Sequence, residues 1–398
     1  MAEGIQVRSI MKIRGRVLVL AVSLPVIAFA VIGGFMGKAI ARQDSYQYLR
    51  IFEDVVSLIL NNYVEEVNVD KVMHGAMHGL ADGLDADSAY LDVAQVRVLD
   101  KGDSGGAGQT GLELTRQYYL RVIAARDGSP AAKAGLMPGD YIRAIDGQST
   151  RDTTVYEGQR LLRGKPGTKV RLTVLRGNAA EPHEIDLVRE ELPAVPVKSR
   201  IAAPGVGYLR VAEFGKATAD QIKNEVAALQ KAGAKSIVID LRGTAFGDAE
   251  SGFAAARLFV KSGVLGYRQD RGKEKEAVSA AAGDGAIALN TVLLTDNGTS
   301  SGAEVFAAAL AGNKRAQLIG ERTLGRAARQ KLVRLPDGSA LMLTHLVYLT
   351  PGSAAIHEKG LVPDVAVEQP DTDFGQPPPA KDATLDKAIE TLTLKAAA

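Results

Sequence analysis

The strongest constraint on the fold is an alternation of apolar strands and amphipathic helices that begins near residue 195. A short apolar stretch at residues 207–211 precedes a helical pattern at 220–232, and residues 236–241 are apolar enough for a strand buried on both faces. Such alternation is typical of a sheet with helices packed against it. We therefore predict an α/β core over residues 194–368.

Within this core, a turn rich in glycine, serine and threonine leads into an apolar helical run at residues 303–310. The turn places Ser301 at a helix N-terminus, where unpaired backbone N–H groups and the helix dipole would stabilise an oxyanion. A serine followed three residues later by Glu304 is also a capping box. The residues alone leave Ser301 as either a helix cap or a nucleophile.

Composition excludes several kinds of chemistry. The 398 residues contain no cysteine, which excludes disulfides, thiolate catalysis and cysteine-bound metals. A charged fraction of 24% and a net charge of +2 give no indication of nucleic-acid binding. His74 and His78 have a spacing that can hold a metal, but without a third ligand we interpret them as part of a solvated helix face. We expect neither a metal nor an organic cofactor.

The N-terminal segment predicts export. Residues 17–37 form an uncharged apolar run, preceded by four basic residues, Arg8, Lys12, Arg14 and Arg16. About 20 apolar residues span a bilayer as a helix, and basic residues stay on the cytoplasmic side. A cleaved signal peptide is the alternative, since Ala-Ile-Ala at residues 39–41 has the form of a cleavage site. We favour an uncleaved anchor in residues 1–42, hence a single-pass inner (cytoplasmic) membrane protein with its body on the periplasmic or extracytoplasmic side.

Changes in composition divide the rest of the chain. Apolar residues recur at spacings of three and four from Tyr48 to Leu60, and a second helical run covers residues 69–80, so we predict a helical region at 43–100. The glycine- and serine-rich residues 101–110 mark a boundary before a domain at 107–193. The prolines at 377–379 predict a stiff linker within residues 369–398, before a last amphipathic helix at 385–392.

Residues 107–193 resemble a PDZ domain. The matching segments are the strand at 119–122, the long run GSPAAKAGLMPGD at 128–140, IRAIDG at 142–147, and the loop Gly111, Leu112, Glu113 and Leu114. The resemblance implies that a peptide adds as a strand at the sheet edge, with its terminal carboxylate held by backbone N–H groups of that loop. Leu112 and Leu114 would line the pocket for an apolar last side chain. The alternative is a PDZ-like domain that only packs on its neighbour.

From about residue 48 to 367 the chain resembles the carboxyl-terminal processing proteases, also called tail-specific proteases. The segment LDADSAY at 84–90, the DLR opening at 240–242, the SGAE turn at 301–304 and the closing segments at 347–352 and 360–364 occur in this family's order. The resemblance implies a ClpP/crotonase-like α/β core and serine peptidase activity on unfolded or tail-exposed proteins. Under this resemblance, assembly into an oligomer and binding of an adaptor protein both stay open. It implies Ser301 as the nucleophile, with oxyanion donors at Gly302 and the 246–247 loop, which contains Gly247.

Two catalytic positions depart from the family. Its general-base lysine falls on Arg326, and the glutamine that orients the base falls on Gln330. A guanidinium has a pKa above about 12 and is not deprotonated in proteins, so Arg326 cannot accept the proton of Ser301. The Asn-Pro-Gly of the oxyanion loop is replaced by Thr244, Ala245 and Phe246. Without glycine at position 246 a positive φ becomes costly, so we expect an altered oxyanion loop.

The sequence offers no replacement for the missing base. On a strand of period two Lys331 points away from the face that carries Gln330. We interpret His357 as a surface loop residue, because the family uses no histidine there. Our prediction is a serine-type endopeptidase that recognises protein C-termini through its PDZ domain. The alternative is a catalytically impaired pseudoprotease that serves as a scaffold and binds C-termini.

Overall fold

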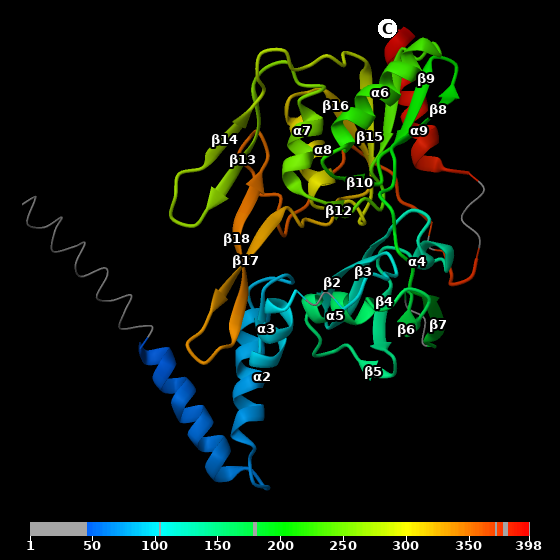
Figure 1. Cartoon of the computed structure of the whole chain (residues 1–398). Coiled ribbons are helices and arrows are strands. Elements are labelled where there is room, and N and C mark those ends of the chain that lie inside the picture. Colours follow the sequence, from blue (N-terminus) through cyan, green and yellow to red (C-terminus); the bar gives the residue numbers. More distant parts are fainter. Residues whose placement is uncertain (1–45, 103–104, 178–180, 371, 377–380, 398) are drawn as a thin grey trace, which may run out of the picture. The chain divides into compact units, whose positions relative to one another are not determined.

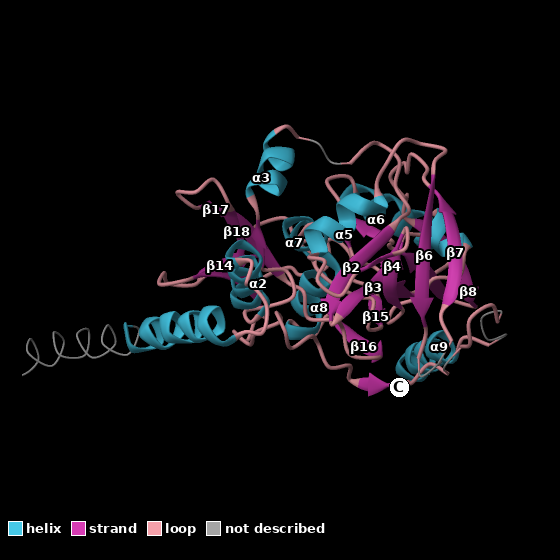
Figure 2. Cartoon of the chain, turned by 90° about the horizontal axis from the view of Figure 1, so that it is seen from below, coloured by secondary structure: helices cyan, strands magenta, loops and turns pink. Residues whose placement is uncertain are grey.

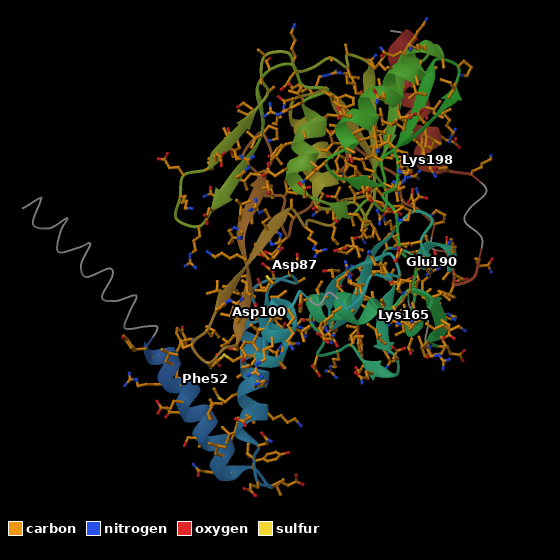
Figure 3. All side chains as sticks on the ribbon, in the orientation of Figure 1. Phe52, Asp87, Asp100, Lys165, Glu190 and Lys198 are labelled. Atoms are coloured by element: carbon orange, nitrogen blue, oxygen red, sulfur yellow. The ribbon has the colours of Figure 1, made fainter. Side chains whose placement is uncertain are left out.

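The computed structural model describes residues 46–102, 105–177, 181–370, 372–376 and 381–397 (Figure 1). The chain divides into two compact units, residues 1–76 and 77–398. In the first unit, residues 46–62 form a helix that exposes apolar side chains such as Tyr48 and Phe52, the latter labelled in Figure 3. The unit boundary falls within α2 (Val69–Asp82). Both helices lie in the part of the chain, residues 43–100, that we predicted to be helical.

The predicted membrane anchor has no support in this structure. Among the residues described, no helix combines the length and the apolar character that crossing a bilayer requires. Residues 17–37, on which the prediction rested, lie outside the described residues. The predicted location as a single-pass inner-membrane protein is therefore contradicted and is not retained.

The α/β core contains a six-stranded sheet in the order β19-β16-β15-β11-β9-β8. β8 runs antiparallel to β9, and the other neighbouring strands are parallel. The strands are β8 (Lys198–Ala203), β9 (Val206–Arg210), β11 (Ser236–Asp240), β15 (Asn290–Thr295), β16 (Ala316–Gly320) and β19 (Val365–Ala366). The α/β character that the alternation in the sequence predicted is confirmed.

Helices cover both faces of this sheet. Ile237 and Ile239 of β11 belong to the core under α6 (Thr218–Lys231), α7 (Ala249–Ala256) and α8 (Gly302–Gly312). Val238 points to the opposite face and packs with α9 (Ala383–Ala397). Alternate side chains of a strand point to opposite faces, so a strand covered on both sides is apolar throughout. In α8 every residue from Gly302 to Leu310 is buried, which makes its N-terminus a rigid platform.

A second, antiparallel sheet lies beside this core. Its path is β1-β18-β13-β14, and β17 also pairs with β18. The strands are β1 (Ala89–Leu91), β13 (Val264–Asp270), β14 (Glu276–Ser279), β17 (Ala328–Arg334) and β18 (Ala340–Leu349), and α3 (Val93–Asp100) follows β1. A short parallel pair joins β10 (Glu213–Phe214) to β12 (Phe246–Gly247). These two small elements position the loop that faces Ser301.

The PDZ-like part is an antiparallel sheet with two helices. The strands β2, β3, β4, β6 and β7, labelled in Figure 2, follow one another in this order in the sheet, and β5 pairs with β4. The elements are β2 (Leu112–Gln117), β3 (Tyr119–Ala125), α4 (Pro130–Lys133), β4 (Tyr141–Ile145), β5 (Gln148–Ser149), α5 (Val155–Leu162), β6 (Lys169–Leu175) and β7 (His183–Val188). β2 lies at the edge of the sheet. The predicted domain limits at 107, 193 and 368 stay a prediction.

Candidate active site

Ser301 has an unusual backbone conformation. Its φ is 55° and its ψ is −121°, a region that non-glycine residues avoid. Its N–H donates to Glu304 Oε2 at 3.2 Å, and its hydroxyl donates to the carbonyl oxygen of Gly247 at 3.4 Å. Backbone strain of this kind costs about 1–3 kcal/mol and concentrates at functional sites.

Ser301 opens onto a cavity of about 430 Å³. Four other predicted site residues line the same cavity: Gly247, Arg326, Gln330 and Glu113. Gly302, the next residue, is buried at the start of α8. The structure therefore brings together residues that lie far apart in the sequence. Among the described residues that line this cavity, none is a lysine or a histidine.

Arg326 lies just before β17 and is fixed by two carboxylates. Its Nε lies 2.8 and 2.9 Å from the carboxylate oxygens of Asp87, and its Nη1 donates to Glu113 Oε1 at 2.6 Å. Asp87 comes from the loop before β1 (Figure 3), and its side chain is 6% exposed. Burial alone would lower the pKa of Arg326, but the two carboxylates outweigh it and hold the pKa above its usual value. The residue at the base position is thus a fixed cation.

Glu304 joins the turn of Ser301 to the turn of Arg326. Its carboxylate is fully buried and accepts the N–H groups of Ser301, of Gly325 at 2.6 Å and of Arg326 at 2.8 Å, together with the hydroxyl of Thr323. Burial raises the pKa of Glu304 to about 7, although these donors favour the ionised form. The sequence indicated Glu304 only as a cap, because three of the four donors are 19 to 22 residues away.

The loop opposite Ser301 retains the glycine that its conformation needs. The positive φ, 105°, falls on Gly247, and Phe246 is not among the described residues with positive φ. A Cβ at position 247 would lie 1.8 Å from the carbonyl oxygen of Phe214, so no other residue fits. The expected backbone problem at Phe246 therefore does not arise. Its ring packs against Ile123 and Ala124 of β3.

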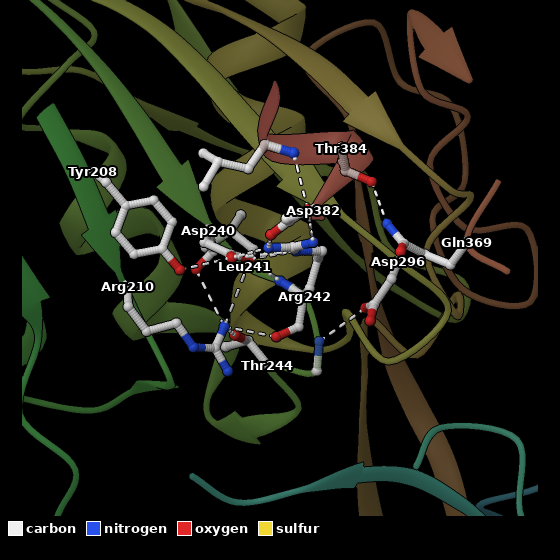
Figure 4. Close-up of polar contacts among 12 residues, drawn as sticks. Tyr208, Arg210, Asp240, Leu241, Arg242, Thr244, Asp296, Gln369, Asp382 and Thr384 are labelled. Atoms are coloured by element: carbon white, nitrogen blue, oxygen red, sulfur yellow. Dashed lines mark hydrogen bonds and ion pairs between the residues drawn. The ribbon is translucent and has the colours of Figure 1, made fainter. Parts of the chain in front are cut away.

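Ion pairs hold the start of this loop in place (Figure 4). The guanidinium of Arg242 bonds Asp240 at 2.6 Å and Asp382, next to α9, at 2.7 Å. Arg210 donates to the carbonyl oxygen of Arg242 at 2.6 Å and to the hydroxyl of Thr244 at 3.1 Å. Burial would raise the pKa of Asp240, but the hydrogen bond and charge of Arg242 hold it below its ordinary value. The charged DLR segment thus fixes the loop that leads to Gly247.

The other polar groups of the cavity already have partners. Gln330 Nε2 donates to the hydroxyl of Thr344 at 3.2 Å. Asp248 caps α7 by accepting the N–H of Ser251 at 2.9 Å. Glu250 accepts two hydrogen bonds from Arg268, at 2.8 and 2.6 Å, which lower its pKa. The carboxylates of Asp248 and Glu250 are thus already engaged in hydrogen bonds within the fold.

His357 is not a surface residue, contrary to our interpretation of the sequence. Its side chain is 12% exposed, and its Nε2 lies 3.5 Å from Asp85 Oδ2. The nearby carboxylate of Asp85 raises the pKa of His357. His357 does not line the Ser301 cavity. It ties the loop before β1 to the segment that follows β18.

The predicted peptide-binding loop has two kinds of side chain. Leu112 and Leu114 are 4% and 0% exposed and belong to the core of the PDZ-like sheet. Glu113, between them, reaches Arg326 instead. Gly111 has a φ of 81° in the turn before β2. The described residues include no group of three or more His, Asp and Glu side chains placed to hold a metal.

Comparisons with known proteins define the class. Residues 205–367 match peptidase family S41, and residues 121–176 match the PDZ domain family. The chain is 31% identical over 315 residues to the carboxy-terminal processing protease CtpA of Bacillus subtilis, covering 79% of this chain and 67% of that protein. It is 30% identical over 334 residues to the carboxy-terminal-processing protease of Bartonella bacilliformis, covering 82% and 77%.

A solved structure agrees with this. The photosystem II D1 C-terminal processing protease is 26% identical, with a TM-score of 0.67 over 80% of this chain and 92% of that one. The chain is thus a serine peptidase of family S41 by fold and sequence. It belongs to the carboxy-terminal processing proteases and carries a PDZ domain.

Proposed function

We propose that this protein binds exposed C-termini of unfolded or tail-exposed proteins in its PDZ domain and hydrolyses peptide bonds of the bound chain at Ser301. The observation that carries the proposal is the strained backbone of Ser301, beside a cavity and at the N-terminus of a helix that is buried from Gly302 to Leu310. Ser301 and Glu304 form the predicted capping box, but a plain helix cap needs no positive φ, since caps normally have extended backbone. The strain therefore supports a second role for Ser301, as a nucleophile, besides capping α8.

In this reaction the Ser301 oxygen attacks the scissile carbonyl carbon, the peptide C–N bond breaks, and the amine fragment leaves with the proton of the serine, which gives an acyl-enzyme. Water then hydrolyses the ester, which releases the carboxylate fragment and regenerates Ser301. The N–H groups of Gly302 and of the Phe246–Gly247 loop are the donors proposed for the oxyanion. β2 offers a free sheet edge on which a peptide tail can add as a strand. Glu113 on that strand lines the Ser301 cavity, so the tail site and the cleavage site are neighbours.

Neither a lysine nor a histidine lines the described part of the cavity to accept the proton of Ser301. Arg326 stays charged and cannot accept this proton. In serine proteases that lose a member of the catalytic group, oxyanion donors and binding leave about 10³–10⁴-fold acceleration over water. We therefore expect slow cleavage rather than none.

A specific observation favours a second function, binding of C-termini without cleavage. Arg326 is held by Asp87 and Glu113, so the base position is a structural ion pair rather than a vacant site. A protein with this arrangement can still bind tails at β2. This is the pseudoprotease interpretation.

Both functions are tested by incubating the protein with an unfolded protein that ends in an apolar C-terminus. Cleavage is followed by mass spectrometry, and binding of a fluorescent peptide with the same tail by anisotropy. Ser301→Ala is the control for cleavage, and a peptide with an amidated C-terminus is the control for binding. Cleavage that Ser301→Ala abolishes supports the peptidase. Tail binding without cleavage supports the second function, and the absence of both contradicts each.

A further inference from the structure

The surroundings of Arg326 differ from what an amine base needs. Two carboxylates from separate elements contact its guanidinium, Asp87 from the loop before β1 and Glu113 from β2. A lysine acts as a base only when its pKa is depressed, so that the neutral amine is populated. An opposite charge within about 4–6 Å shifts a pKa by about 1–3 units towards the charged form.

We propose that Asp87 and Glu113 form a carboxylate pair that keeps any basic side chain at position 326 charged, whether arginine or lysine. The departure from a Ser/Lys arrangement would then involve three residues and not one. Restoring a neutral amine requires the removal of this negative charge as well as Arg326→Lys. The effect of this pair on catalysis rests on the proposed function of Ser301 as the nucleophile. The effect of the pair on the charge of the side chain at position 326 does not depend on Ser301.

Among the described residues, Arg326 is the cation that bonds Glu113 directly, at 2.6 Å, and Arg163 acts on Glu113 through its charge. Burial raises the pKa of Glu113, whereas the charges of Arg326 and Arg163 favour its ionised form. Glu304, the third carboxylate near this turn, accepts the backbone N–H of Arg326 and not its guanidinium. A lysine ammonium at position 326 would therefore face Asp87 and Glu113. Each neighbouring carboxylate reduces the neutral fraction of the amine by about tenfold or more.

The pair can be neutralised without changing its shape. Asp87→Asn and Glu113→Gln are isosteric and keep one oxygen each that can accept a hydrogen bond from a lysine. They remove the charge only. Asp87 is nearly buried, so each substitution is made singly and together, which keeps the comparison available if one variant folds poorly.

The first experiment measures the pKa of the introduced lysine directly. The full-length Arg326→Lys variant is labelled with lysine carrying ¹³C at Cε, and the resonance that the parent lacks is followed by NMR as the pH rises. We expect a titration midpoint at or above the ordinary lysine value of about 10.4. In Arg326→Lys combined with Asp87→Asn and Glu113→Gln we expect the midpoint to fall by at least about two units. Equal midpoints, or a midpoint already depressed in Arg326→Lys alone, would overturn the proposal.

A matched control removes a carboxylate elsewhere. Asp100, labelled in Figure 3, forms an exposed ion pair with Arg334, with a distance of 2.5 Å between Asp100 Oδ1 and Arg334 Nη2. Arg326→Lys combined with Asp100→Asn should keep the midpoint of Arg326→Lys alone. A fall of the same size in this variant would assign the effect to net charge and refute a local pair.

The second experiment measures the reactivity of Ser301 with a fluorophosphonate probe at pH 8, with Ser301→Ala as the blank. We expect labelling at least about tenfold faster in the triple variant than in Arg326→Lys alone. Equal rates in the two would contradict the proposal. A lowered lysine midpoint without any labelling would uphold the carboxylate pair and refute Ser301 as the nucleophile, so the two proposals fail in distinguishable ways.

Discussion

The buried carboxylate of Glu304 predicts an unusual dependence of stability on pH. Its pKa is about 7 in the folded protein, against an ordinary value of 4.5. Between these values the folded state binds more protons than the unfolded state, so stability falls as the pH rises. The contribution of Glu304 to the free energy of unfolding is complete below pH 4.5 and is lost above pH 7. Between pH 5 and pH 8 the loss amounts to about 2.5 kcal/mol.

Glu304→Gln removes this titration while keeping the size of the side chain. The variant loses acceptors for the N–H donors of the two turns, which costs stability at every pH. The informative quantity is therefore the free energy of unfolding of the parent minus that of the variant. We expect this difference to decrease by about 2.5 kcal/mol from pH 5 to pH 8.

The assay is urea unfolding followed by circular dichroism, because the chain contains no tryptophan for fluorescence. Glu274→Gln, at an exposed position, is the matched control, and its difference from the parent should stay within about 0.5 kcal/mol. A difference for Glu304→Gln that stays constant between pH 5 and pH 8 would show that the four donors keep the carboxylate ionised throughout. A difference that grows with pH would mean that the folded protein lowers the pKa of Glu304. That result would refute the argument that burial raises it.

Three further perturbations test other parts of the site. Arg326→Met leaves Asp87 and Glu113 unpaired, and we expect a loss of about 3 kcal/mol in urea unfolding, the lower end for a buried pair because Arg326 is 23% exposed. Adding Asp87→Asn should recover part of that loss, and no recovery would contradict the ion-pair argument. Gly247→Ala places a methyl group against the backbone of β10, so we expect a loss of more than about 2 kcal/mol together with loss of fluorophosphonate labelling; a stable variant that labels normally would refute the proposed loop geometry. The raised pKa of His357 contributes stability that is complete at low pH and is lost as the pH rises through the folded pKa. The parent should therefore lose stability relative to His357→Gln when thermal unfolding is compared at pH 5.5 and pH 8.5, and an unchanged difference would argue against the Asp85 contact.

Local patterns predicted the parts of the fold that depend on nearby residues. The apolar run at residues 236–241 predicted β11, and the turn before residues 303–310 predicted α8, because strand and helix periods are visible within a few residues. The resemblance to known proteases also predicted Ser301, Arg326 and Gln330 as site residues. The structure places these three residues around one cavity.

The contacts that decide the chemistry were not predictable in the same way. Asp87 and Glu113 reach Arg326 across 239 and 213 residues, and no local pattern indicates such a pairing. The concern over Phe246 was misplaced, because the sequence does not show which residue of the loop takes the positive φ. His357 was misassigned because neither its position in a loop nor the family pattern reveals that this segment folds back onto Asp85.

The single carboxylate of Glu304 holds the backbone of both active-site turns through N–H groups that any residue other than proline provides. The side chain at position 326 can therefore change while the backbone around it keeps its anchoring. For protein engineering, this chain is a host in which a catalytic base can be installed by exchanging side chains alone, without rebuilding a loop.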